Sequence, residues 1–260
     1  MNILRKKLKN REKIFGGWTS IGHPQISEML AFSGIDFLGI DLEHSTINQE
    51  QSQRIISVCD ALGVGCLPRV PSHNPESIKR LLDSGAKGVI VPNVETEKQV
   101  QSIINWVKYP PNGQRGFGVS RAQGYGFNFE NYVSNWNDNS VIIIQIESVE
   151  AVRNIKLLLN YDEVDGVMIG PYDLSGSLGI PGQIHHEKVL NAVNQVYEAC
   201  REFGKACGPH EVEPSLESVN QAFDSGGTFV VLSSDIFIFW KWGEKMKCLI
   251  NEFKSDKIVL

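Results

Sequence analysis

The chain repeats a short pattern in which a helical segment ends at glycine and a run of apolar residues follows at once. The pattern occurs three times, as FSGIDFLGI, LLDSGAKGVIV and AFDSGGTFVVL. Glycine is favoured at the left-handed residue that closes a helix, and continuous aliphatic and β-branched runs are typical of strands buried on both faces. The repetition therefore predicts an α/β chain with a parallel sheet.

The same alternation extends over the whole sequence. We predict strands at residues 15–20, 36–40, 65–70, 88–91, 141–146, 165–169, 205–208 and 228–232. We predict helices near residues 25–33, 49–62, 75–84, 96–107, 149–158, 187–203, 216–224 and 236–253. Eight strand–helix units in 260 residues have the size of a (β/α)8 TIM barrel. An open, doubly wound sheet is the alternative, but no GxGxxG sequence follows the first strand to indicate a dinucleotide site.

Composition limits the class of protein. The chain is 42% hydrophobic and 21% charged, as in ordinary globular proteins, and no linker-like segment divides it, so we expect one domain over residues 1–260. The net charge of −5 argues against a nucleic-acid partner. No apolar run reaches the length of about 18 residues that predicts a membrane span. Five scattered cysteines fit the reducing cytoplasm, where we expect the protein to be.

Two acidic residues follow consecutive predicted strands. Glu147 ends VIIIQIE, and Asp173 ends VMIGPYD. A strand–helix–strand unit brings both to the carboxyl edge of a parallel sheet, where their oxygens form a candidate site for a hard divalent cation such as Mg²⁺ or Mn²⁺. Either acid alone could instead occupy the first turn of a helix, where the helix dipole favours negative charge.

The other predicted strand ends are also polar. They are Trp18, the sequence Asp41-Leu42-Glu43-His44, Arg69, Asn93, Gln145 and His210. A buried guanidinium at Arg69 requires an anionic partner, which is either a neighbouring carboxylate or a substrate. Asp41 and Glu43 could cap the next helix, and His44 taken by itself fits a surface histidine better than a catalytic one. Asp83 ends a predicted helix, where an acid opposes the helix dipole and so indicates a specific partner.

These side chains favour the chemistry of an enolate. No lysine ends a predicted strand, which argues against a Schiff-base aldolase. A divalent cation would hold a 2-oxo acid and stabilise its enolate, Arg69 would add a fixed positive charge, and a histidine would move the proton. The expected reaction is cleavage of a 4-hydroxy-2-oxo acid into pyruvate and an aldehyde, or the reverse addition.

Six longer motifs extend this expectation: GIDFLGIDLEH, PRVP, LLDSGAKGVIVPNV, GQRGFGVSRAQGYG, IIQIES and IGPYDLSGSLGIPGQ. Together they resemble the HpcH/HpaI aldolase family of metal-dependent (class II) pyruvate aldolases, from about residue 15 to residue 235. The resemblance implies that Glu147 and Asp173 are metal ligands and that Arg69 holds the enolate oxygen. It also implies that His44 is the catalytic base and Asp83 its acidic partner.

The resemblance also predicts contacts with the substrate. Gln145 matches a polar residue beside the bound pyruvate. The turn made by Gly170, Pro171, Tyr172 and Asp173 would present backbone N–H groups to the pyruvate carboxylate. Trp18 and Arg121 are further predicted contacts. Arg115 and Arg121 are the candidates to bind an anionic tail of the aldehyde, and a charge-paired surface loop is the alternative for both. Tyr172 departs from the small residue of well-known family members and would narrow the aldehyde pocket. The cofactor is expected to be Mg²⁺ or Mn²⁺, with Co²⁺ or Zn²⁺ as alternatives.

Assembly is the last property that the resemblance implies. Family members are hexamers, built as trimers of dimers that exchange their last helices, and the aromatic segment 236–253 fits a helix buried against a partner. We predict that segment 110–137 is a long loop that acts as a lid or a subunit contact. Alternatives to the aldolase are a lyase acting on a CoA thioester, an oxaloacetate decarboxylase and, from a different class, a non-catalytic binding barrel.

Overall fold

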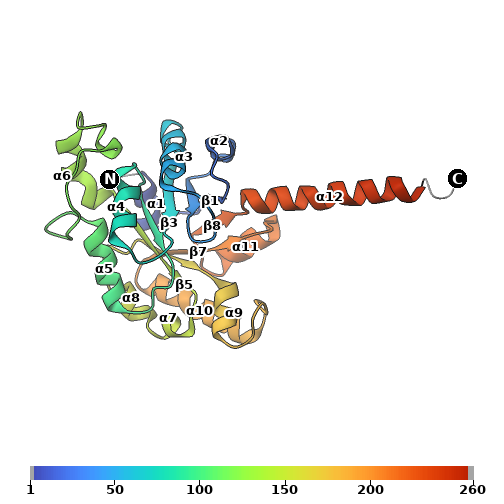
Figure 1. Cartoon of the computed structure of the whole chain (residues 1–260). Helices are drawn as coiled ribbons and strands as arrows, with labels where there is room; N and C mark the ends of the chain where they lie inside the picture. The colour runs from blue at the N-terminus through green and yellow to red at the C-terminus, as the bar shows by residue number, and fades with distance from the viewer. Residues whose placement is uncertain (1–2, 257–260) are drawn as a thin grey trace.

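The computed structural model describes residues 3–256 and contains a closed barrel of eight parallel strands (Figure 1). The strands follow one another in sequence order: β1 (Ile14–Thr19), β2 (Phe37–Asp41), β3 (Gly65–Arg69), β4 (Gly88–Val91), β5 (Val141–Ile146), β6 (Gly166–Ile169), β7 (Ala206–Glu211) and β8 (Phe229–Leu232). Pairing of β8 with β1 closes the sheet. The predicted (β/α)8 barrel is therefore confirmed, and the open-sheet alternative is wrong.

Helices alternate with the strands along the chain, and most of them cover the outside of the barrel (Figure 1). They are α1 (Ile3–Lys9), α2 (Pro24–Ala31), α3 (Gln49–Ala61), α4 (Pro75–Asp83), α5 (Glu97–Val107), α6 (Phe129–Asn139), α7 (Val149–Arg153), α8 (Ile155–Leu159), α9 (Pro171–Ser177), α10 (Glu187–Glu202), α11 (Leu216–Asp224) and α12 (Asp235–Asp256). The single helix predicted at 149–158 is in fact two, α7 and α8, which are separated at Asn154. Helices α1, α6 and α9 were not predicted.

The interior of the barrel is filled by side chains that alternate along each strand. Ile14 and Trp18 of β1 and Phe37 of β2 belong to the buried cluster inside it, because residues two apart on a strand point to the same face. Gly39 continues the inward face of β2, and a Cβ atom there would lie 2.2 Å from the Trp18 ring. The absence of a side chain at Gly39 therefore allows the indole of Trp18 to lie across β2.

Helix α1 closes the amino-terminal end of the barrel, which we call the base. Its Leu4 and Leu8 join the cluster inside the barrel. Its Arg5 Nε donates to Asp165 Oδ1 over 2.8 Å, and both side chains are buried. A helix of seven residues is too short to be stable alone, so these tertiary contacts must stabilise it.

Segment 110–137 was predicted to be one long loop, but it is not. It contains a short 3₁₀ helix, η1 (Arg121–Gln123), and most of α6. The buried Arg115 side chain organises it, with its guanidinium carbon 4.6 Å from the ring centre of Trp136 and 4.8 Å from that of Tyr109. Cation–π contacts of this kind fix the segment against the barrel. Its action as a lid or subunit contact stays a prediction.

Helix α12 leaves the barrel and projects away from it (Figure 1). Its first residue, Asp235, is buried and accepts hydrogen bonds from Thr19 Oγ1 over 2.6 Å and from the Ser20 amide over 2.9 Å. These bonds attach the start of α12 to the loop that follows β1.

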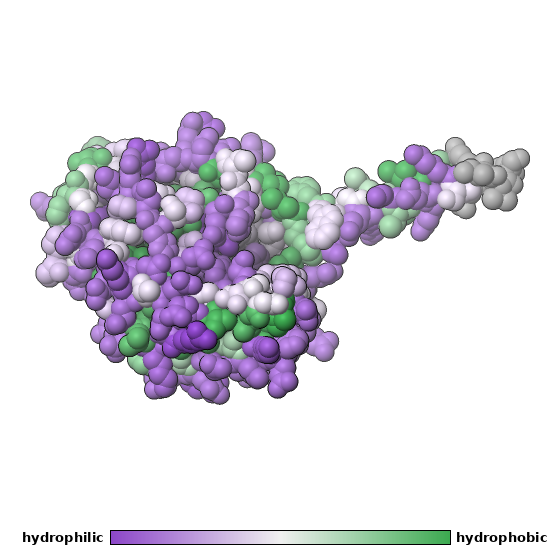
Figure 2. All heavy atoms as spheres, turned by 60° about the horizontal axis from the view of Figure 1, so that its bottom comes forward, coloured by the Kyte–Doolittle hydropathy of each residue, from purple (hydrophilic) through white to green (hydrophobic). Residues whose placement is uncertain are grey.

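The projecting part of α12 exposes large apolar side chains. Phe239, Trp240 and Trp242 are each more than half exposed, and Figure 2 shows hydrophobic residues along the projecting helix and on the body where it joins. Exchange of this helix between subunits stays a prediction. Across residues 3–256, no helix combines the length and the apolar character needed to cross a membrane.

Candidate active site

Polar side chains gather at the carboxyl-terminal end of the barrel, which we call the mouth. Trp18, Asp41, Arg69, Gln145 and His210 lie at or near the ends of five strands. Each lies two or four residues after an inward-facing residue of the same strand. Because alternate residues of a strand face the same side, all five side chains face the barrel axis. The carboxyl ends of barrel strands are where catalytic residues are found in this fold, which makes the mouth the candidate active site.

Arg69 has the anionic partners that its position required. Its Nη2 donates to Asp41 Oδ2 over 2.8 Å, and its Nε lies 3.2 Å from Glu43 Oε2. The guanidinium carbon also lies 5.0 Å from the centre of the Trp18 ring. Two carboxylates and an aromatic face therefore hold the guanidinium in one orientation.

Asp41 joins Arg69 to the neighbouring turn. Besides Arg69, its carboxylate accepts hydrogen bonds from the backbone amides of Glu43 and His44, over 3.1 and 3.0 Å. Burial alone would raise the pKa of Asp41, but Arg69 and the donors around it outweigh burial and hold the pKa below its usual value. Asp41 is therefore an ionised anchor that fixes both Arg69 and the start of the loop carrying His44.

Glu147 lies in a different environment from Asp41. Its Oε1 accepts a 2.6 Å hydrogen bond from the Asn93 amide, and its Oε2 accepts one from Gln145 Nε2. The pKa of Glu147 is raised to about 7, mainly by burial; the negative charges of Asp173 and Glu43 act in the same direction, and the two hydrogen-bond donors oppose them. No cation among the described side chains is bonded to this carboxylate, so its ionised form lacks a counter-charge.

Two backbone features hold Glu147 in place. Asn93 has a positive φ of 55°, a left-handed conformation that costs a non-glycine residue about 1 kcal/mol or more and that points its amide at Glu147. On the other side, a Cβ atom at Gly170 would lie 2.9 Å from the Cβ atom of Glu147. Glycine at this position therefore permits the chain after β6 to approach the carboxylate closely.

Asp173 completes a set of oxygen donors. It is exposed in the first turn of α9, and its charge acts on both Glu147 and Glu43. The buried Oε1 of Gln145 has no hydrogen-bond partner. Uncompensated carboxylates beside an unpartnered amide oxygen suit a hard divalent cation, and Mg²⁺ commonly uses one or two carboxylates together with waters. Within residues 3–256, no group of three or more His, Cys, Asp or Glu side chains forms a complete metal cage.

The turn before Asp173 offers backbone donors. Helix α9 begins at Pro171 after Gly170, so the amides of Tyr172 and Asp173 belong to its first turn and have no acceptor inside the helix. In the described part of the chain they also make no other hydrogen bond. The Tyr172 side chain is exposed. The geometry is compatible with the predicted carboxylate contact, which stays a prediction, as does the narrowing of the pocket by Tyr172.

The predicted partnership of His44 with Asp83 is not formed within the described chain. The His44 side chain is 69% exposed, and its Nε2 lies 3.9 Å from Glu43 Oε2. Asp83, the last residue of α4, instead accepts a 2.7 Å hydrogen bond from Arg115 Nη2. The roles of His44 and Asp83 in catalysis remain predictions.

Arg121 lies outside the mouth. Its guanidinium donates to the carbonyl oxygen of Ser84 over 3.0 Å and to Asp60 Oδ2 over 3.2 Å, between the ends of helices α3 and α4. It therefore contacts the outer helical layer within this chain. Its predicted role in binding the aldehyde is not tested by these contacts.

Three residues of the mouth were not predicted as site residues, although all three were recognised as strand ends. Asp41 and Glu43 bind Arg69, and His210 stacks on Trp18 with 5.1 Å between ring centres. The alternation of inward positions along β2 and β7 was the signal that could have selected Asp41 and His210.

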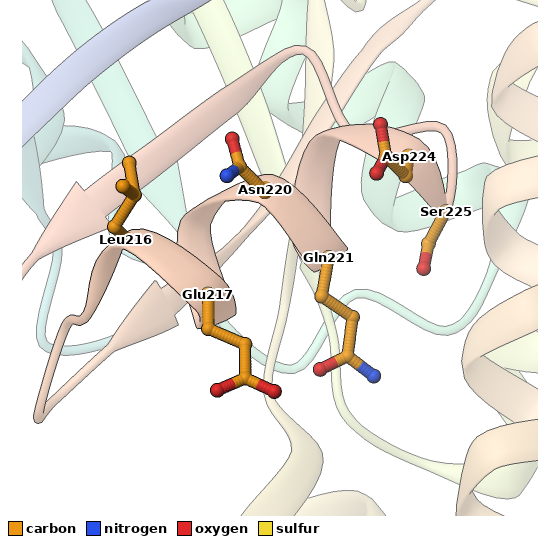
Figure 3. A pocket seen from close by; sticks show the side chains of 6 residues that line it. All are labelled: Leu216, Glu217, Asn220, Gln221, Asp224 and Ser225. Carbon is orange, nitrogen blue, oxygen red and sulfur yellow. The ribbon is translucent and has the colours of Figure 1, made fainter.

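A second hollow lies away from the mouth. It is lined by side chains of α11 and the residue after it, including Glu217, Asn220 and Asp224, with a volume of about 920 Å³ (Figure 3). In Figure 3 these side chains spread along the helix and do not point toward a common centre. The hollow has no basic side chain, and its polar groups do not converge, so it is not the candidate active site.

Known proteins share both the sequence and the fold. Residues 15–241 match the family model described as HpcH/HpaI aldolase/citrate lyase. The hydroxypyruvate/pyruvate aldolase of Roseobacter denitrificans is 33% identical over 248 residues, which cover 95% of this chain and 96% of that protein. The 2-keto-3-deoxy-L-rhamnonate aldolase of Klebsiella pneumoniae is 33% identical, with 98% of this chain and 94% of that protein covered.

A solved structure agrees with the sequence comparison. The crystal structure of an HpcH/HpaI aldolase from Desulfitobacterium hafniense superposes with a TM-score of 0.88 at 30% identity, covering 97% of this chain and 98% of that one. Both kinds of comparison extend over almost the whole chain, including the strands that carry the mouth. The chain therefore belongs to the HpcH/HpaI aldolase/citrate lyase family.

Proposed function

We propose that this protein is a metal-dependent aldolase, a carbon–carbon lyase that cleaves 4-hydroxy-2-oxo acids to pyruvate and an aldehyde, or joins the two. The observation that carries the proposal is the charge of the mouth. Four carboxylates, those of Asp41, Glu43, Glu147 and Asp173, act on one another there, and Arg69 is the guanidinium bonded among them. The names of the pyruvate and 2-keto-3-deoxy acid aldolases among its relatives support the same chemistry.

Glu147 and Asp173 are the proposed holders of a divalent cation, with Mg²⁺ or Mn²⁺ as the first candidates. When bound, the cation supplies Lewis-acid stabilisation of the developing enolate charge. Gln145 would contribute its unpartnered oxygen beside it. The donor set is made of oxygen atoms only, which favours a hard cation over one that requires thiolates.

The remaining steps use the side chains and backbone of the chain. Arg69, already oriented by Asp41, would stabilise negative charge on the enolate oxygen without reorganising. The free amides of Tyr172 and Asp173 would bind the pyruvate carboxylate. His44 would take a proton from the methyl group of pyruvate, and its exposed side chain is accessible to a substrate in the mouth.

The proposal is tested most directly without knowing the aldehyde. Metal-stripped protein is mixed with pyruvate in D₂O, and the methyl signal of pyruvate is followed by proton NMR with and without Mg²⁺ or Mn²⁺. We expect loss of the signal only with the cation and only when His44 is present, so His44→Ala is the control. Absence of exchange in the metal-loaded wild-type protein would refute the pyruvate aldolase and favour a CoA-thioester substrate.

We further propose that the protein is a cytoplasmic homo-oligomer, a hexamer of three dimers that exchange α12. The exposed aromatic residues along this 22-residue helix support the exchange, because apolar surface of this extent needs cover. The five cysteines, all free thiols, fit a reducing compartment. Deletion of the residues after Asp235 is expected to lower the mass measured by light scattering; an unchanged mass would contradict the exchange.

A further inference from the structure

Part of the wall of the mouth has no role in the reaction proposed above. The proposed metal donors and Arg69 come from β3, from β5 and from the start of α9. Strand β7, which pairs with β6 on the side away from β5, contributes a polar side chain that the reaction does not use, His210. A reaction that joins two substrates needs a place for the second one beside the first.

His210 points into this space. It follows Ala206 and Gly208 at intervals of two along β7, and Ala206 belongs to the cluster inside the barrel. Its ring lies 5.1 Å from the Trp18 ring, and Trp18 Nε1 is 3.4 Å from Asp41 Oδ2. His210 is therefore part of the same layer of inward side chains as Arg69 and its partners.

The hydrogen bond at one ring nitrogen determines what the other can do. His210 Nε2 lies 2.8 Å from the carbonyl oxygen of Ser233. A carbonyl oxygen only accepts, so Nε2 carries the hydrogen, and in the neutral ring Nδ1 is left as an acceptor. Burial, helped by the Arg69 charge, outweighs the hydrogen bond to Ser233 and the Asp41 charge and lowers the pKa of His210, which favours that neutral form.

Nδ1 is available to a ligand. Within residues 3–256 it makes no hydrogen bond, and His210 is half-buried at the mouth, not enclosed in the core. The rigid ring holds Nδ1 in a fixed position facing the mouth, so Nδ1 is suited to accept a hydrogen bond from a bound molecule.

We propose that His210 is a specificity-determining residue that binds a hydroxyl group of the aldehyde substrate through Nδ1. The inference rests on the proposed aldolase function and deepens it, because it assigns the aldehyde to the hydroxyaldehydes. A carboxylate tail is disfavoured, since the lone pair of Nδ1 would repel it. Arg69, the cation next to His210, is already paired with Asp41 and Glu43.

Two substitutions separate the functional contact from the structural one. His210→Gln places an amide near the former Nε2 and can keep the bond to Ser233, but it removes the acceptor at the position of Nδ1. His210→Asn places an amide near the former Nδ1 and gives up the bond to Ser233. The two variants therefore remove different halves of the imidazole.

The measurement is kcat/KM for the addition of pyruvate to 2-hydroxypropanal and to propanal, with Mg²⁺ present. For each protein, kcat/KM for 2-hydroxypropanal is divided by kcat/KM for propanal. Comparing this ratio between a variant and the wild-type protein cancels the intrinsic reactivity of the aldehydes. We expect His210→Gln to lower the ratio about tenfold, the scale of one hydrogen bond, while addition to propanal is largely kept. His210→Asn is expected to keep most of the preference.

Three outcomes would overturn the inference. An unchanged ratio in His210→Gln, with normal exchange of the pyruvate methyl protons in D₂O, would remove His210 from recognition and leave the aldolase intact. An equal loss with both aldehydes would assign His210 a structural role. Failure of the wild-type protein to exchange the methyl protons would refute the aldolase, and the inference would fall with it.

Discussion

The two ends of the barrel both bury charged side chains, but they treat them differently. At the base, the buried Asp165 is paired with Arg5 and also accepts a 3.0 Å hydrogen bond from the amide of Ile142. Nearby, the buried Lys108 Nζ donates to three oxygens, those of Asn137 and Ser140, over 2.8 to 3.0 Å. At the mouth, Glu147 has a raised pKa and no bonded cation.

The base of the barrel therefore contributes mainly to stability, and the mouth contributes mainly to the proposed function. At the base, each of these buried charged groups has hydrogen-bond partners inside the chain, although burial still lowers the pKa of Lys108 to about 8, so their removal should affect folding. Charges at the mouth are left partly uncompensated, which destabilises the free protein but prepares it for a cation and an anionic substrate. Substitutions at the base should therefore lower stability and leave activity unchanged, whereas substitutions at the mouth should lower activity more than stability. Four experiments test this difference.

The largest effect is expected at Glu147. Removal of divalent cations with EDTA should abolish aldol activity, and Mg²⁺ should restore it. Glu147→Gln should lower kcat at least about 10³-fold, because several kcal/mol of charge stabilisation are lost. The same variant should be no less stable than the wild type when both are metal-free, as measured by urea unfolding. Full activity after chelation would contradict the metal mechanism.

Arg69 should give the next largest effect. Arg69→Ala should lower kcat about 10²-fold or more, the scale of losing one oxyanion donor. Arg69→Lys keeps the charge but loses the fork that binds Asp41 and Glu43, so it should recover only part of the rate. Steady-state kinetics with pyruvate as one substrate measure both variants. A near-normal rate in Arg69→Ala would exclude a direct role for the guanidinium.

At the base, Arg5→Met should act on stability alone. Asp165 would remain buried without its partner, which is expected to lower the free energy of unfolding by about 3 kcal/mol. Activity per folded molecule should stay within about twofold of wild type, in contrast to the variants of the mouth. The measurements are urea unfolding and kcat on the same samples. A loss of kcat without a loss of stability would remove the distinction between the two ends.

The smallest effect concerns pH. The pKa of Glu147 is raised from 4.5 to about 7, so between these values the folded, metal-free protein holds a proton that the unfolded chain has released. As pH rises through this window, Glu147 therefore lowers the free energy of unfolding of the metal-free protein. A cation must displace the same proton, so its affinity should weaken by up to about tenfold per pH unit below pH 7.

Calorimetric titration of Mg²⁺ or Mn²⁺ at several pH values measures this dependence. Glu147→Gln cannot titrate and serves as the matched control for residual binding. An affinity that does not change between pH 5.5 and pH 7.5 would show that Glu147 is already ionised in the free protein.

Much of the fold was predictable from the sequence, because buried strands and their glycine-capped helices leave strong local signals. Strands β4 and β5 begin and end where predicted. Helix α6 was missed, since its asparagine-rich sequence has low intrinsic helix propensity, and packing of Tyr132 and Trp136 around Arg115 compensates for it. Helix α1 was missed because its stability depends on contacts with distant residues such as Asp165.

The candidate site was predictable only in part, for a similar reason. Strand ends that carry Arg69, Glu147 and Asp173 can be recognised one at a time. The bonds that join Arg69 to Asp41, or His210 to Ser233, depend on which strands become neighbours and on their register. Local sequence does not contain that information.

Gly39 has a consequence for how this mouth can change over time. Since any side chain at Gly39 would meet the indole of Trp18, a single codon change there would displace a bulky ring at the mouth without replacing any charged residue. Exchange of Trp18 for a smaller residue would deepen the same space. Because the same indole lies against Arg69 and Asp41, a change in the shape of accepted molecules at this position would also act on the groups proposed to carry the chemistry, and the two would have to evolve together.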